Sequence, residues 1–111
     1  GCCAFSPDGK RIVTASRDTT ARLWSAATGA LLVTLRGHTG SVRTCIFSSD
    51  SERVVTASYG KTARLWDADT GTLLLKLEEH ADRVTSCSFS PDGKRLVTSS
   101  GDKTARFWDA E

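Results

Sequence analysis

The 111-residue chain contains no methionine, only two prolines and no long run of apolar residues. A membrane-spanning helix needs about 20 consecutive apolar residues, so none is predicted here. The 15 lysines and arginines and the 13 aspartates and glutamates are interspersed, without an extended run of one sign. This distribution disfavours a dedicated nucleic-acid groove, which usually carries a clustered basic stripe.

No signal peptide is predicted in these residues either. The chain begins with Gly1 rather than methionine, and its first residues already belong to the repeat described below. We therefore expect the natural polypeptide to start further upstream, or the chain to be an excised piece of a longer one.

The four cysteines, Cys2, Cys3, Cys45 and Cys87, include no Cys-x-x-Cys pair, so no zinc site is predicted. The last three are spaced 42 residues apart, which places them in different predicted sheets. A disulfide needs Cα atoms within about 7 Å. We expect free thiols that fill the core as small apolar residues, and hence a reducing compartment, cytoplasmic or nuclear. A Cys2–Cys3 redox pair is a remote alternative.

An internal repeat dominates the sequence. Shifting the chain by 42 residues aligns it with itself without a gap, and 22 of the first 42 positions recur. The shift superimposes three phenylalanines, three tryptophans and two histidines: Phe5, Phe47 and Phe89; Trp24, Trp66 and Trp108; His38 and His80. A period of this length predicts a repeat architecture.

Each repeat is predicted to form β-strands only, because short runs rich in Val, Ile, Leu and Thr alternate with polar turns. The predicted strands are 2–5, 11–15, 20–24 and 31–35; then 42–47, 53–57, 62–66 and 73–77; then 84–89, 95–99 and 104–108. Residues 6–9 and 90–93 read Ser-Pro-Asp-Gly, which suits a type I turn. The middle copy, 48–51, keeps only polar turn formers. No segment shows helical periodicity.

Four strands per 42 residues is the pattern of a propeller blade, whose faces are buried by stacking on neighbouring blades. We predict an all-β fold, 1–111, made of an open arc of three four-stranded antiparallel sheets, the third lacking its outer strand. The blades are expected at about 1–36, 37–78 and 79–111. Propellers close with about 4–8 blades, so we expect a fragment of a longer propeller, with possible self-association through the uncovered end blades.

The repeats resemble those of the WD-repeat β-propeller family over essentially the whole chain. The matching motifs are Gly37-His38, the Phe-Ser-Pro-Asp-Gly segments, the strand end Ala57-Ser58, and Trp66-Asp67 and Trp108-Asp109. The repeats depart from the family pattern at Trp24-Ser25, at Glu79-His80, and at Gly60, where the sibling repeats carry Asp18 and Asp102.

The resemblance implies a hydrogen-bonded chain of a His, an Asp, a Ser or Thr and a Trp inside each blade. By motif position these are His80, Asp102, Ser100 and Trp108 in the third blade; His38, Ser58 and Trp66 in the second; and Ser16, Asp18 and Trp24 in the first. We expect the second to be the weakest, because Gly60 offers no acceptor and an unpaired buried donor costs about 1–3 kcal/mol.

His80, Asp102 and Ser100 also resemble the Ser-His-Asp set of hydrolases, which is a remote alternative function. These residues stand at positions that recur with the 42-residue repeat, and the sequence has no Gly-x-Ser-x-Gly motif of the kind that presents a nucleophilic serine. We therefore interpret the set as structural and expect no enzyme. The two histidines lie one per blade without a second ligand nearby, so no metal site and no cofactor are expected.

The resemblance further implies that other proteins or peptides dock on the loop face of the propeller. The positions that point there include Arg17, Tyr59, Ser41, Arg43, Arg83 and Thr85. Arg and Tyr are enriched at interface hot spots. The leading interpretation is a non-catalytic protein–protein interaction scaffold. The alternative is nucleic-acid or phospho-ligand binding through surface arginines, which steep salt dependence of binding would indicate.

Overall fold

The computed structural model describes residues 2–78 and 80–110, and every regular element in them is a β-strand. The first blade contains β1 (Cys3–Phe5), β2 (Arg11–Ala15), β3 (Ala21–Ser25) and β4 (Leu31–Leu35). The second contains β5 (Val42–Phe47), β6 (Arg53–Ser58), β7 (Ala63–Asp67) and β8 (Leu73–Leu77). The third contains β9 (Val84–Phe89), β10 (Arg95–Ser100) and β11 (Ala105–Asp109).

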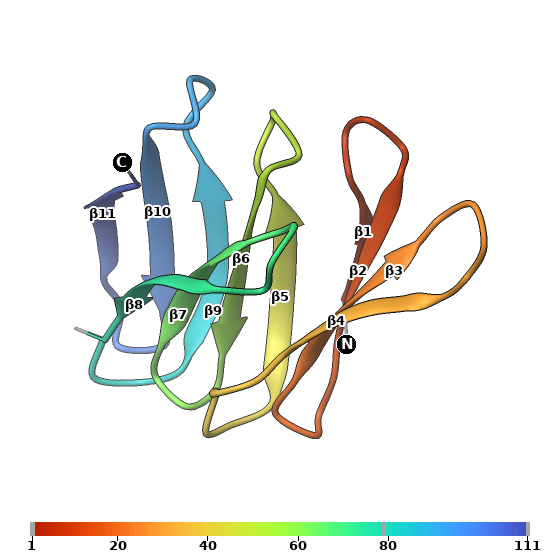
Figure 1. Ribbon diagram of the computed structural model, residues 1–111. Helices are drawn as coiled ribbons and strands as arrows, with labels where there is room; N and C mark the ends of the chain where they lie inside the picture. Colours follow the sequence, from red (N-terminus) through yellow and green to blue (C-terminus); the bar gives the residue numbers. More distant parts are fainter. Residues whose placement is uncertain (1, 79, 111) are drawn as a thin grey trace.

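Each blade is an antiparallel meander in which neighbouring strands follow one another in sequence. The registers repeat: Val13 lies opposite Leu23, Val55 opposite Leu65, and Val97 opposite Phe107. The three sheets stand side by side along the chain and do not close into a ring (Figure 1). Among the described residues the third sheet has three strands, β9 to β11. The predicted fold class, an open arc of antiparallel blades, is confirmed.

The turn between the first two strands of each blade has one geometry in all three repeats. The backbone N–H of Gly9 donates to the carbonyl of Ser6 at 2.9 Å, and 48–51 and 90–93 repeat this bond. The middle turn lacks proline and glycine, yet Ser51 adopts the same left-handed conformation, with φ of 63° against 73° for Gly9. The Ser48 hydroxyl also donates to the Asp50 carboxylate at 2.5 Å, as Ser6 does to Asp8 at 2.6 Å. Local polar contacts therefore replace the missing turn residues.

Apolar side chains from facing sheets form two core layers. Between the first and second blades the layer includes Val13, Leu23, Leu35, Val54, Trp66 and Ala68. Between the second and third it includes Val55, Leu65, Leu77, Cys87, Leu96 and Ala110. The middle sheet is thus covered on both faces, whereas each outer sheet is covered on one.

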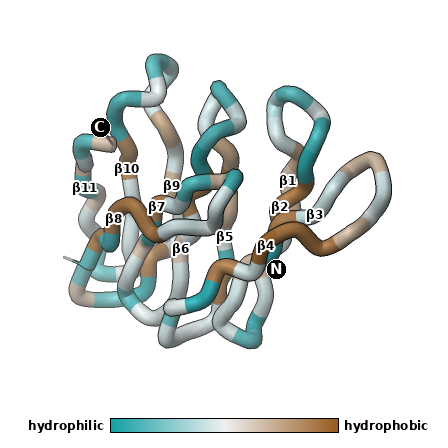
Figure 2. The backbone as a smooth tube through the Cα atoms, viewed as in Figure 1, coloured by the Kyte–Doolittle hydropathy of each residue, from teal (hydrophilic) through white to brown (hydrophobic). Residues whose placement is uncertain are grey.

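The outermost strands β4 and β8 carry exposed leucines, which appear as the most hydrophobic stretches in Figure 2. The exposed side chains are Leu31, Leu32, Leu73 and Leu74. No helix long and apolar enough to cross a membrane occurs among the described residues.

Candidate functional site

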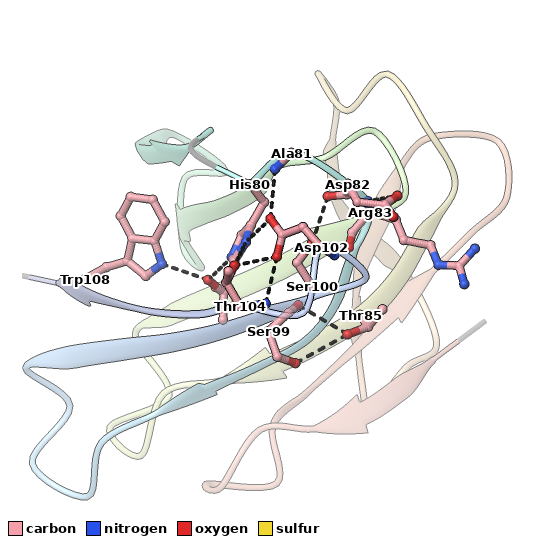
Figure 3. Close-up of polar contacts among 11 residues, drawn as sticks. His80, Ala81, Asp82, Arg83, Thr85, Ser99, Ser100, Asp102, Thr104 and Trp108 are labelled. Carbon is pink, nitrogen blue, oxygen red and sulfur yellow. Dashed lines mark hydrogen bonds and ion pairs between the residues drawn. The ribbon is translucent and has the colours of Figure 1, made fainter.

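The hydroxyl of Thr98 lies at the centre of the polar network in the third blade. Figure 3 shows the His80, Asp102 and Trp108 side chains of this network. The indole N–H of Trp108 donates to Oγ1 of Thr98 at 2.8 Å, and Nε2 of His80 lies 2.7 Å from the same oxygen. The other ring nitrogen of His80 lies 3.3 Å from the carboxylate of Asp102. Thr98 is fully buried. The network therefore links His80, Asp102 and Trp108 as predicted, through a different hydroxyl.

The assignment of Ser100 to this network was wrong. Its hydroxyl donates to the backbone carbonyls of Asp82 and Arg83, at 3.1 and 2.8 Å, and accepts the N–H of Asp102 at 3.2 Å. Trp108 lies opposite Leu96, so the next residue on the same face of the strand is Thr98. Ser100 is two residues further along, about 6.6 Å away, and beyond a register shift in the sheet.

The middle blade repeats this arrangement with Thr56 in place of Ser58. Trp66 donates its indole N–H to Oγ1 of Thr56 at 2.9 Å, and Nε2 of His38 lies 2.6 Å from that oxygen. The Ser58 hydroxyl instead accepts the backbone N–H of Gly60 at 3.0 Å. Among residues 2–78 and 80–110, the partner of Nδ1 of His38 is the hydroxyl of Thr62, at 3.3 Å, where the third blade has a carboxylate.

In the first blade, Trp24 donates to Oγ1 of Thr14 at 3.0 Å, so Ser16 is again not the indole's partner. Its hydroxyl accepts the backbone N–H of Asp18 at 3.2 Å. The Asp18 carboxylate accepts the hydroxyl and backbone N–H of Thr20 and pairs with Arg22 at 3.2 Å. Thr20 in particular holds the pKa of Asp18 well below its usual range.

Burial and hydrogen bonding shift the pKa of His38 in the middle blade and of Asp102 in the third. Burial, and secondarily the charge of Arg64, lowers the pKa of His38 to about 4, so the ring is neutral near pH 7 and offers one N–H. The hydroxyl of Thr104, followed by the backbone N–H of Ala81, holds the pKa of Asp102 well below its usual range. No hydrogen bond joins Ser100 to His80 in the part of the chain that the structure describes. The Ser100 hydroxyl donates instead to the backbone carbonyls of Asp82 and Arg83.

The cysteines fall into two environments. Cys45 and Cys87 are buried, and Cys3, at the same repeat position, is exposed. Burial raises the pKa of both buried thiols, to about 12 for Cys87. All four cysteines are free thiols. Among residues 2–78 and 80–110, no group of three or more His, Cys, Asp or Glu side chains gathers in a way that could hold a metal ion.

Three of the predicted partner-binding residues gather on the loop face at the junction of the second and third blades. Tyr59, which follows β6, is 42% exposed. The guanidinium carbon of Arg43, on β5, lies 4.8 Å from the centre of its ring, and that of Arg83, just before β9, lies 5.1 Å from it. We call these residues the Arg–Tyr–Arg cluster.

The other three predicted positions lie outside this cluster. Arg17 is exposed in the turn after β2, with no ring contact or ion pair among the described residues. Ser41 supports the cluster through its backbone, since its carbonyl accepts the N–H of Tyr59 at 3.0 Å. The Thr85 hydroxyl donates to the Ser99 carbonyl at 3.2 Å. Position within the repeat does not predict that these three side chains meet, because Arg43 and Tyr59 belong to the second blade and Arg83 belongs to the third.

Comparison with known proteins agrees with the repeat geometry. A family model described as "WD domain, G-beta repeat" matches residues 1–25, 29–67 and 71–109. WD repeat-containing protein 86 of Homo sapiens is 51% identical over 39 residues, which cover 35% of this chain. Notchless protein homolog of Arabidopsis thaliana is 53% identical over 36 residues, which cover 32% of this chain. These matches span only 10% and 8% of the two relatives.

WD repeats generally mediate protein–protein interaction scaffolding and are typically non-catalytic. The family model covers nearly the whole chain. Its second and third matched segments each begin with the outer strand of one blade, β4 or β8, and continue through three strands of the next blade. The 42-residue period, the Thr-centred Trp networks and this match all identify the chain as a member of the WD-repeat family.

Proposed function

We propose that the chain is a non-catalytic scaffold that binds an acidic segment of a partner protein through the Arg–Tyr–Arg cluster. The observation that carries this proposal is the placement of two guanidinium groups over one exposed tyrosine ring, within about 5 Å of its centre. Charge and aromatic surface are therefore combined on the loop face, as at interface hot spots.

The two arginines have unused hydrogen-bonding capacity. Each guanidinium carbon lies over the Tyr59 ring, and neither side chain forms a hydrogen bond or ion pair within the described residues, so their N–H groups have no partner there. A guanidinium edge binds a carboxylate with two parallel N–H bonds. The nearest acid in sequence, Asp82, accepts the backbone N–H of Arg83 at 2.7 Å. A carboxylate of a partner is thus the ligand that this surface fits.

The cluster is also restrained before binding. Tyr59 is fixed by its backbone bond to Ser41, and the Arg83 carbonyl accepts the N–H of Gly101 at 3.0 Å. Long side chains that are already ordered lose less conformational entropy on binding. The two arginines held over one ring should therefore bind an acidic segment more tightly than isolated surface arginines would.

Fluorescence anisotropy with a labelled oligoglutamate peptide tests the proposal. We expect the Arg43→Gln/Arg83→Gln variant to bind about tenfold or more weakly, because charge-assisted hydrogen bonds are lost. Arg17→Gln is the matched control, since it removes one exposed arginine outside the cluster. Equal binding by the wild type and the double variant would contradict the proposal.

A second arm of the same experiment uses a labelled oligothymidine strand. Tighter binding of this strand than of the peptide, with a steep fall in affinity as salt rises, would favour the nucleic-acid alternative. Catalysis is tested separately with an activated ester. Turnover above background that is lost in Ser100→Ala would contradict the non-catalytic part of the proposal.

A further inference from the structure

One arginine contact joins each pair of neighbouring blades. Arg11 of the first blade donates to the carbonyl of Ala68 at 2.7 Å and to that of Ser51 at 2.6 Å, both in the second blade. Forty-two residues later, Arg53 of the second blade donates to two carbonyls of the third, those of Ala110 at 2.6 Å and Gly93 at 2.7 Å.

A phenylalanine of the receiving blade completes each contact. The guanidinium carbon of Arg11 lies 6.0 Å from the ring centre of Phe47, and that of Arg53 lies 5.5 Å from that of Phe89. One blade therefore supplies an arginine, and the next supplies two backbone carbonyls and an aromatic ring. We call this set the inter-blade arginine contact.

The repeat contains the parts of a third such contact, divided between the two ends of the arc. Arg95, at the position of Arg11 and Arg53, is exposed, and its guanidinium has no hydrogen bond or ion pair within the described residues. The matching acceptors, the carbonyls of Gly9 and Ala26, and the matching ring of Phe5 lie on the first blade. Phe5 is 68% exposed.

The burial of equivalent residues shows that both end faces are uncovered halves of a blade interface. At the position of Leu23 and Leu65, which are 0% and 1% exposed, the third blade presents Phe107 with 78% exposed. A surface depression of about 370 Å³ lies beside it, lined by Lys94, Arg95, Phe107, Trp108 and Asp109. On the first blade, Cys3 is exposed, whereas its equivalent Cys45 is buried against the preceding blade.

We propose that these two faces bind each other between two copies of the chain, head to tail. Arg95 of one copy donates to the carbonyls of Gly9 and Ala26 of the other and lies over Phe5, while Phe107 packs on the uncovered face of the first blade. The contact needs another blade of this repeat, which a second copy supplies. Two copies together carry six blades, within the range of about 4–8 that closes a ring.

Sedimentation velocity of the 111-residue chain over a wide concentration range tests this assembly. We expect reversible association to a dimer or a higher head-to-tail multiple, weakened about tenfold or more in Arg95→Ala because its charge-assisted hydrogen bonds are lost. Arg36→Ala, which removes the same charge at another exposed site, should associate like the wild type. A monomer at every concentration would overturn the proposal. Association that Arg95→Ala leaves unchanged, for example through the open edge of β11, would also overturn it.

A gain-of-function variant gives a second test. Arg11 also pairs with the carboxylate of Asp69 at 2.8 Å, and the equivalent position on the first blade is the exposed Ala27. Ala27→Asp should therefore offer a carboxylate to Arg95 of the other copy and strengthen association. The gain should vanish in the Ala27→Asp/Arg95→Ala double variant. An equal gain with and without Arg95 would show that this arginine is not the partner.

Chemical labelling of Cys3 provides a readout that does not depend on mass. The proposed interface covers Cys3, so its labelling rate should fall as the wild-type concentration rises and stay constant in Arg95→Ala. Protection that is equal in both proteins would overturn the proposed geometry.

Discussion

Trp66 donates its indole N–H to the hydroxyl of Thr56 at 2.9 Å, inside the middle blade. The same hydroxyl lies 2.6 Å from Nε2 of His38, so one oxygen serves two buried rings. Thr56→Val would keep the shape of the side chain and leave both rings without this partner. We expect the free energy of unfolding to fall by about 2–3 kcal/mol, measured by urea denaturation.

Thr14→Val is the matched control, because Thr14 holds the half-buried Trp24, and no histidine contacts it among the described residues. We expect this variant to lose less stability, about 1 kcal/mol, since water reaches part of the indole. Equal losses in the two variants would contradict the shared role of the Thr56 hydroxyl.

The missing carboxylate of the middle blade can be restored with two substitutions. A Cβ at Gly60 would lie 2.5 Å from the Thr39 hydroxyl and 3.0 Å from the Gly40 nitrogen. The third blade has Ala81 at the position of Thr39, and its N–H donates to Asp102 at 2.9 Å. Gly60→Asp/Thr39→Ala should therefore raise the melting temperature by about 4–8 °C per kcal/mol gained.

The gain has two sources. A carboxylate at 60 would accept from His38, and it would be four residues before Arg64, as Asp18 is before its ion-pair partner Arg22. Arg64 is 8% exposed and has a buried Nε without a partner among the described residues. Gly60→Ala/Thr39→Ala adds the same Cβ without the charge and should not show the gain. A melting temperature that is the same in both double variants would argue against the carboxylate network.

His38 should make stability depend on pH. Its pKa is about 4 in the folded protein against about 6.5 in an exposed histidine, so the unfolded chain binds the proton first as pH falls. The free energy of unfolding should decrease from about pH 6.5 to about pH 4, and the His38 contribution should level off below that. Urea denaturation at stepped pH measures this slope.

His38→Gln should flatten the slope in that window, whereas Thr14→Val, which keeps His38 intact, should retain it. A slope that persists unchanged in His38→Gln would assign the titration to another group. Aspartates whose pKa lies below the usual range, such as Asp18 and Asp102, add their own loss of stability from about pH 5 downwards, so the His38 slope is separated from theirs between about pH 5 and 6.5.

Thiol reactivity should separate the cysteines into two groups. The thiolate is the reactive form, and burial raises the pKa of Cys45 and Cys87, whereas Cys3 is exposed. In dilute native protein, iodoacetamide followed by peptide mass spectrometry should label Cys3 first. Cys45 and Cys87 should be labelled only after unfolding. Rapid labelling of Cys45 in the native protein would contradict the buried core layer.

The strands and their order could be predicted from the sequence, because the 42-residue period aligns apolar runs and turns directly. The bridging hydroxyl could not be chosen correctly among the polar residues near the end of β10. That choice depends on the register of Trp108 against Leu96, which places Thr98 on the same face of the sheet. The Ser-Thr-rich composition there gives no local signal for it.

The side-chain contacts between neighbouring blades could not be predicted from the sequence either. One position of the repeat is occupied by Arg11, Arg53 and Arg95. This recurrence indicates a shared role for the three arginines, but it does not identify the groups that accept their hydrogen bonds. Those acceptors are backbone carbonyls of the next blade, and carbonyls carry no sequence signature. The Arg–Tyr–Arg cluster is hidden for the same reason, since Arg83 reaches Tyr59 across a blade boundary.

The middle sheet is covered on both faces, and this determines the order in which the sheets unfold locally. Residues Val54 to Ser58 of β6 are all buried, whereas only Val13 is fully buried in β2. Opening an end sheet breaks one layer of contacts, while opening the middle sheet breaks two, so local openings begin at the ends of a stacked array. Backbone amides of β1 and β11 should exchange with deuterium within the shortest labelling times, and those of β6 and β7 should be the last to exchange.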